Sequence, residues 1–96
     1  MIVPEEELVN YLGNDVNSLE GKIKQATLEK LRRYDAHTIE EFSLPAIDYI
    51  FLAHQKGTRS LRALAKEVRI SHDTLCRVFD FYGLPTMTQA EGVRRN

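Results

Sequence analysis

The sequence predicts an all-α protein, and three observations support this fold class. Apolar residues recur at three- and four-residue steps along most of the chain, which is the spacing of one face of a helix. No stretch alternates strictly between apolar and polar residues, and no Asn-Gly or Asp-Gly pair is present to close a hairpin. Helix-capping residues and glycines separate the periodic stretches.

The composition is that of a small folded protein in a reducing compartment. The 96 residues suffice for one domain, and a chain that is 43% hydrophobic and 28% charged is neither disordered nor embedded in a membrane. The single cysteine, Cys76, has no partner for a disulfide, and the scattered histidines do not complete a zinc-binding pattern. We expect a cytoplasmic protein, because the sequence shows no secretion signal and no apolar run of membrane-spanning length.

Two helices are expected in the first third of the chain. Pro4 and the three glutamates that follow it favour a short helix through about Leu12. A longer helix of about five turns is predicted from an N-cap at Asp15. Its apolar stripe comprises Val16, Leu19, Ile23, Ala26, Thr27, Leu31 and Tyr34. We expect this stripe to pack into the core, although its spacing also fits a coiled-coil homodimer through residues 15–34.

The middle of the chain continues the helical pattern. The capping-box spacing from Thr38 to Glu41 predicts a brief turn, after which Pro45 restarts the chain as a helix over 44–56 that stops at Gly57. We therefore divide the chain into an N-terminal helical segment (1–43), a central unit (44–83) and a C-terminal extension (84–96). A second capping box predicts a further helix in the extension, beginning at Thr88.

The central unit contains two short helices joined by a tight turn. Residues 58–83 read TRSLRALAKEVRISHDTLCRVFDFYG. Ser60 and Ser71 are placed to cap the two helices, and the small Ala65 suits the point where their axes cross. Ile70 and Leu75 have the hydrophobic-staple spacing, which fixes how the chain enters the second helix.

These residues resemble the helix-turn-helix of the homeodomain-like kind, which recombinases, transposases, many regulators and some intron-encoded nucleases share. The family pattern is an alanine in the first helix, a glycine in the turn, then an apolar residue, a capping Ser or Thr, and apolar residues in the second helix. The matching residues here are Ala65, Ile70, Ser71, Leu75 and Val78. Arg69 stands where glycine is usual. The resemblance covers residues 44–83.

The resemblance implies that the chain binds double-stranded DNA and reads the major groove with the helix from Ser71 to Phe81. The residues expected to face the bases are His72, Asp73, Cys76 and Arg77. Those expected to face phosphates are Arg59, Ser60, Arg62 and Ser71, with Arg94 and Arg95 in the extension. Arg77 is the leading candidate for base contact, because a guanidinium can hold guanine O6 and N7 together.

The charge distribution agrees with nucleic-acid contact. Residues 1–56 hold six Lys/Arg against ten Asp/Glu, whereas residues 57–96 hold seven against four. The central unit and the extension are therefore the basic half of a chain whose net charge is only -1. We expect the function to be regulatory.

Two other functions fit the same sequence. The first alternative is the DNA-targeting module of a larger nuclease or recombinase, and the second is a protein-interaction module, without DNA binding, whose acidic first half docks a partner. We do not expect an enzyme, a metal site or a cofactor. The sequence lacks a glycine-rich phosphate loop, a metal-ligand cluster and a nucleophile beside a base, and the adjacent Glu40 and Glu41 point about 100° apart on a helix.

Overall fold

The computed structural model describes residues 3–57 and 59–86, and all regular structure in this part of the chain is helical. The elements in order are the 3-10 helices η1 (Glu5–Tyr11) and η2 (Val16–Leu19) and the α-helices α1 (Gln25–Phe42), α2 (Ala46–Gly57), α3 (Leu61–Val68) and α4 (His72–Tyr82). The predicted all-α fold class is confirmed. The helix predicted from Thr88 lies outside the described residues, as do Arg94 and Arg95.

The predicted helix over 15–34 is wrong. Asp15 does act as an N-cap, since its side chain accepts a hydrogen bond from the Asn17 N–H, but the helix that it caps is the four-residue η2. Gly21 follows with a φ of +81°, in the left-handed region, and this turn ends the first helical stretch. The long helix α1 starts only at Gln25, and it has no side-chain cap.

The turn predicted at Thr38 is also wrong, because α1 continues through it to Phe42. A capping threonine must lie outside the helix that it caps. Thr38 instead lies inside α1, where it is fully buried and its hydroxyl donates to the Asp35 carbonyl oxygen at 3.1 Å. The helix ends at Ser43, whose φ of 59° is left-handed.

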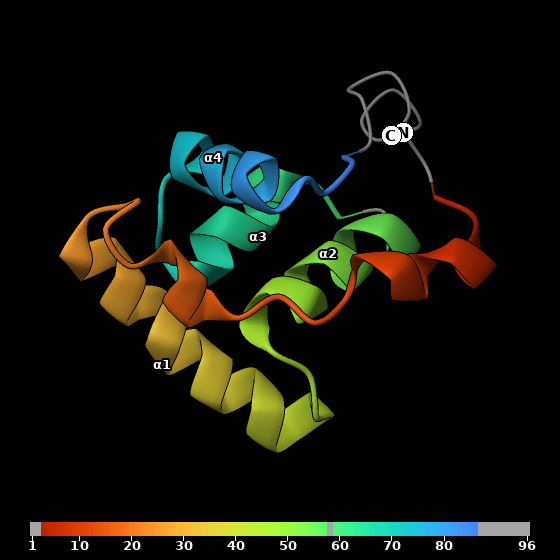
Figure 1. Cartoon of the computed structure of the whole chain (residues 1–96), viewed down its shortest axis with the longest axis horizontal. Helices are drawn as coiled ribbons and strands as arrows, with labels where there is room; N and C mark the ends of the chain where they lie inside the picture. The colour runs from red at the N-terminus through yellow and green to blue at the C-terminus, as the bar shows by residue number, and fades with distance from the viewer. Residues whose placement is uncertain (1–2, 58, 87–96) are drawn as a thin grey trace.

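Helix α2 begins two residues later than predicted and ends, as predicted, at Gly57. Its first N–H, on Ala46, donates to Asp35 Oδ1 of α1 at 2.7 Å, so a side chain from the preceding helix caps it. The buried Asp48 in its first turn accepts bonds from the N–H groups of Gly13 and Asn14, at 2.7 and 3.1 Å. The N-terminal segment is thereby held across α2, as Figure 1 shows.

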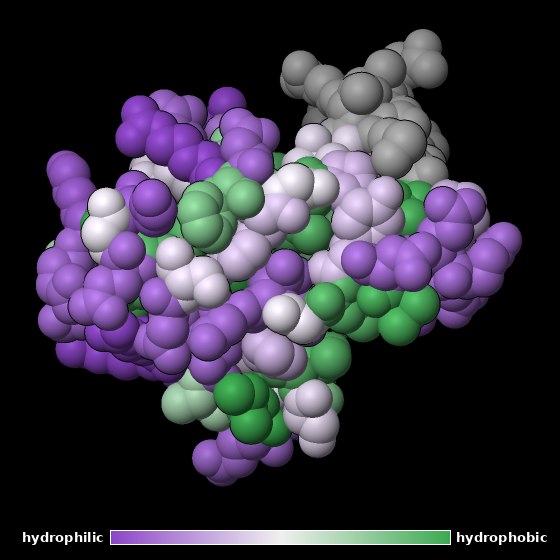
Figure 2. All heavy atoms as spheres, in the orientation of Figure 1, coloured by the Kyte–Doolittle hydropathy of each residue, from purple (hydrophilic) through white to green (hydrophobic). Residues whose placement is uncertain are grey.

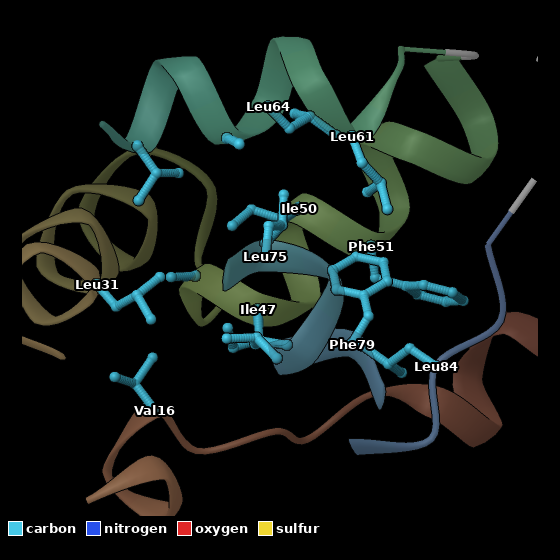
Figure 3. Packing of buried hydrophobic residues seen from close by; sticks show 14 of the residues in the cluster. Val16, Leu31, Ile47, Ile50, Phe51, Leu61, Leu64, Leu75, Phe79 and Leu84 are labelled. Carbon is cyan, nitrogen blue, oxygen red and sulfur yellow. The ribbon is translucent and has the colours of Figure 1, made fainter. Parts of the chain in front are cut away.

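One core joins the first half of the chain to the second. It combines Val3, Leu8, Val16, Leu19, Leu28 and Leu31 with apolar residues of α2, α3 and α4. Figure 3 shows Val16 and Leu31 on one side of this core, Leu61 and Phe79 on the other, and Leu75 between them. The stripe suggested for a homodimer is therefore not a helical seam: Val16, Leu19 and Leu31 are buried within the monomer, and Ala26 is exposed.

In residues 3–57 and 59–86, no helix has the length and apolar character needed to cross a membrane. Figure 2 shows hydrophilic residues over α4 and the first half of α1 on the face that it presents. Among the described residues, the exposed large hydrophobic side chains are those of Val9, Ile39, Phe42 and Phe81.

Candidate nucleic-acid interface

The unit from Leu61 to Tyr82 consists of two short helices joined by a three-residue turn, Arg69 to Ser71. Both predicted caps are present. The Ser60 hydroxyl accepts a bond from the Ala63 N–H, and the Ser71 hydroxyl accepts one from the Thr74 N–H, each at 3.1 Å. The starts of both helices are thus fixed by local hydrogen bonds that the sequence alone predicts.

Arg69 adopts the backbone conformation that glycine usually supplies at this turn. Its φ is 70° and its ψ is 38°, which is left-handed. Its N–H donates to the Lys66 carbonyl, and the next N–H, on Ile70, donates to the Ala65 carbonyl at 3.0 Å. These bonds form the Schellman arrangement that ends many helices, so the turn keeps its geometry with arginine in the position of glycine.

Apolar packing holds the two helices against α2. Ala65 is only 2% exposed, as expected for a small residue where helices pack closely. Figure 3 shows Leu61 and Leu64 of α3 above Ile50 of α2 and Leu75 of α4. The rings of Phe51 and Phe79 lie 6.3 Å apart, centroid to centroid. The inward face of α4 is therefore fully used by the core.

His54 fixes the connection between α2 and α3. The ring is buried, with an edge toward the Phe79 ring, and Nδ1 lies within hydrogen-bond distance of the Arg59 carbonyl oxygen. Because the carbonyl can only accept, Nδ1 carries the proton and donates. Burial lowers the pKa of His54 from its ordinary value, so the neutral ring is favoured.

The outer face of α4 carries the residues predicted to face bases. Asp73 and Arg77 are exposed, whereas His72 and Cys76 are half-buried beside them. His72 Nε2 lies 3.6 Å from Cys76 Sγ, and His72 Nδ1 lies 4.0 Å from an Asp73 carboxylate oxygen. The structure therefore brings all four predicted residues together on one side of one helix. At the far end of α4, the Tyr82 hydroxyl donates to the Asp15 carbonyl of the N-terminal segment.

The potential along this face is mixed. Burial raises the pKa of the Cys76 thiol, and the negative charges of Asp73 and Asp80 raise it further, while Arg62 lowers it. The thiol is therefore protonated at neutral pH and is not an activated nucleophile. The exposed part of α4 therefore carries two carboxylates, Asp73 and Asp80, and one arginine, Arg77.

The residues predicted to face phosphates differ in their availability. Arg62 is exposed in the first turn of α3. Arg59 is instead paired with Glu67, and hydrogen bonding between them raises the pKa of Arg59 and lowers that of Glu67. The hydroxyls of Ser60 and Ser71 each accept a helix N–H bond, which leaves the Ser60 hydroxyl able to donate. The Ser71 hydroxyl is also hydrogen-bonded to the Thr74 hydroxyl at 2.7 Å.

A basic pocket between α1 and the end of α3 was not predicted. It measures about 280 Å³, and we call it the α1–α3 pocket. Its lining residues are Lys30, Arg33, Tyr34, His37, Glu67, Val68 and Arg69. Three of the basic residues, Lys30, Arg33 and His37, follow helical spacing, so a correct position for α1 would have placed them on one face.

In the part of the chain that the structure describes, no group of three or more His, Cys, Asp or Glu side chains could hold a metal ion. A scan against family models and searches of curated proteins and of solved structures found no match to the chain. The resemblance to helix-turn-helix proteins therefore stays a prediction.

Proposed function

We propose that the chain binds duplex DNA with the outer face of α4 in the major groove, and that its role is regulatory. The observation that supports this best is the arrangement from Leu61 to Tyr82, in which two capped helices join through a left-handed turn and the second exposes its outer side chains. In helix-turn-helix proteins this exposed helix enters the groove, and the start of the preceding helix meets the backbone.

Arg77 provides the sharpest test of the proposal. It is exposed, and no side chain in the described part of the chain pairs with it, so it is free to contact a base edge. We expect Arg77→Ala to weaken binding to a selected duplex by about tenfold or more. Fluorescence anisotropy at two salt concentrations measures this, and wild-type affinity should fall steeply as salt rises.

Arg32→Ala is the matched control for that variant. Arg32 is also an arginine on a helix, but it lies on α1 and its side chain is bound to Asn17 and Glu20. We expect this variant to keep nearly wild-type affinity. Equal losses in the two variants would mean that α4 does not contact the duplex.

The two carboxylates on α4 allow a second test of the same placement. Asp73 and Asp80 are exposed, and in a groove they repel phosphates. Replacing both with asparagine should therefore tighten binding to random duplex DNA. A weaker complex would argue that these side chains face a basic partner.

Protein interaction is the second candidate, and the same face favours it. The two carboxylates lie on α4 with the exposed Phe81, which is unusual for a helix that enters a groove of phosphates. Failure of the wild-type chain to bind any duplex at low salt would support this candidate. Binding to a duplex would instead fit both a free-standing regulator and the targeting module of a nuclease or recombinase.

A further inference from the structure

The α1–α3 pocket gathers positive charge. Lys30 and Arg33 line it from α1, and Arg69 lines it from the turn after α3. Neither guanidinium has an ion-pair partner among residues 3–57 and 59–86. The donors of both side chains are therefore available to a ligand.

The one carboxylate in the lining, that of Glu67, is already engaged at both oxygens. The Tyr34 hydroxyl donates to Oε1 at 3.1 Å, and the Arg59 guanidinium binds Oε2. The negative charge of Glu67 is thus matched by Arg59, which does not line the pocket. The charges of Lys30, Arg33 and Arg69 remain unmatched.

Helical spacing and a hydrogen bond hold these groups in place. Lys30 Nζ donates to the Arg69 carbonyl oxygen at 3.0 Å and so ties α1 to the end of α3. Carbonyl groups at the end of a helix repel anions, and the Lys30 ammonium offsets this repulsion. Arg33 lies about one turn further along the same face of α1, and His37 follows it by one more turn.

We infer that the α1–α3 pocket binds a phosphate group. Two guanidinium groups and an ammonium suit phosphate oxygens, because each guanidinium offers paired N–H donors. Small-molecule sites usually measure roughly 300–1,000 Å³, so a pocket of about 280 Å³ fits a small polar group. This inference does not depend on the proposed role of α4 in DNA binding.

The phosphate has two possible sources. Arg69 precedes α4 by three residues, which places the two backbones within about 11 Å, so a phosphodiester flanking a bound groove could reach the pocket. The other source is a free phosphate compound. Both sources present the same oxygens, and the experiment below distinguishes them.

The test titrates pyrophosphate into the full chain at low ionic strength and follows amide chemical shifts. We expect saturable changes around Arg33 and Arg69. The double variant Arg33→Gln, Arg69→Asn should weaken binding by about tenfold or more, since it removes two charge-assisted contacts. Asparagine is chosen at residue 69 because it tolerates a left-handed conformation.

The matched control is the double variant Lys22→Gln, Lys66→Gln, which removes two exposed positive charges outside the pocket. It should bind pyrophosphate nearly as tightly as the wild type does. The inference is overturned if the wild type shows no saturable binding at millimolar pyrophosphate. It is overturned equally if the two double variants lose the same affinity.

A duplex titration then identifies the source. If the pocket holds a DNA phosphate, Arg33→Gln, Arg69→Asn weakens duplex binding and pyrophosphate competes with the duplex. If it holds a free compound, duplex binding by this variant is unchanged. Because Arg77 lies outside the pocket, loss of pyrophosphate binding and loss of groove binding are measured separately.

Discussion

Arg69 is one of two non-glycine residues with positive φ in the described part of the chain; the other is Ser43. A left-handed conformation costs an ordinary residue about 1–2 kcal/mol, while glycine adopts it freely but loses more entropy on folding. We expect Arg69→Gly to raise the free energy of unfolding by about 1 kcal/mol. Urea denaturation measures this change, and Ser43→Gly should act in the same direction.

Ala63→Gly is the control for this prediction. Ala63 is exposed in α3, where the backbone is right-handed, so glycine there should lower the free energy of unfolding by about 1 kcal/mol. Destabilisation by Arg69→Gly as well would show that the arginine side chain contributes more to the folded turn than its backbone strain removes.

Whether the role of a residue in the candidate site could be predicted depends on how close in sequence its hydrogen-bond partner lies. The roles of Ser60 and Ser71 were predictable, because each capping bond closes within three residues of sequence. The role of Arg59 was not predictable, because its partner Glu67 is held in turn by Tyr34 of α1, 33 residues away. Contacts of this kind depend on how helices pack, which the sequence pattern does not specify.

At the scale of elements, the same distinction explains the helices that were placed correctly. Helices α3 and α4 have a cap and a strong apolar face, and both were predicted. Helix α1 has no side-chain cap, and the Leu28 N–H in its first turn donates to the backbone carbonyl of Lys24 at 2.9 Å. Apolar spacing continued across Gly21 and so suggested a longer helix, whereas η2 and α1 are separate helices that pack together.

Asp48 joins α2 to the loop between η1 and η2, and its removal should destabilise the protein. The buried carboxylate accepts from the N–H groups of Gly13 and Asn14 and from Asn14 Nδ2, the last at 2.9 Å. Asp48→Ala leaves three donors without their acceptor, so we expect the free energy of unfolding to fall by about 3 kcal/mol. Asp48→Asn, which keeps one acceptor oxygen, should lose less.

Asp80→Ala serves as the control for the Asp48 series. Asp80 is exposed and its removal should change the free energy of unfolding by no more than about 0.5 kcal/mol. Equal effects at the two positions would mean that the segment at Gly13 does not contribute to folding through Asp48. Chemical denaturation of all three variants in one buffer gives the comparison.

At the scale of the whole molecule, the N-terminal segment and the central unit fold as one body. Val16 and Leu31 share a core with Ile47, Ile50 and Leu75. The division of the chain at residues 43 and 44 therefore marks a change in charge and pattern and does not separate two cores. The sequence indicated which residues are apolar enough for a core, but not that both halves contribute to the same one.

Because the core is shared, protonation of one buried group should affect the stability of the whole chain. Burial lowers the pKa of His54 in the folded state, whereas the unfolded chain binds a proton near pH 6.5. Below about pH 6.5 the unfolded state therefore holds more protons than the folded state, and the stabilisation present above that pH is lost as the pH falls.

We expect the melting temperature to fall between about pH 7 and pH 5.5. His54→Asn, which can still donate to the Arg59 carbonyl, should abolish most of this slope, while the exposed His37→Asn should keep it. The lowered pKa of Glu67 acts only at more acidic pH, so an unchanged slope in His54→Asn would contradict the assignment.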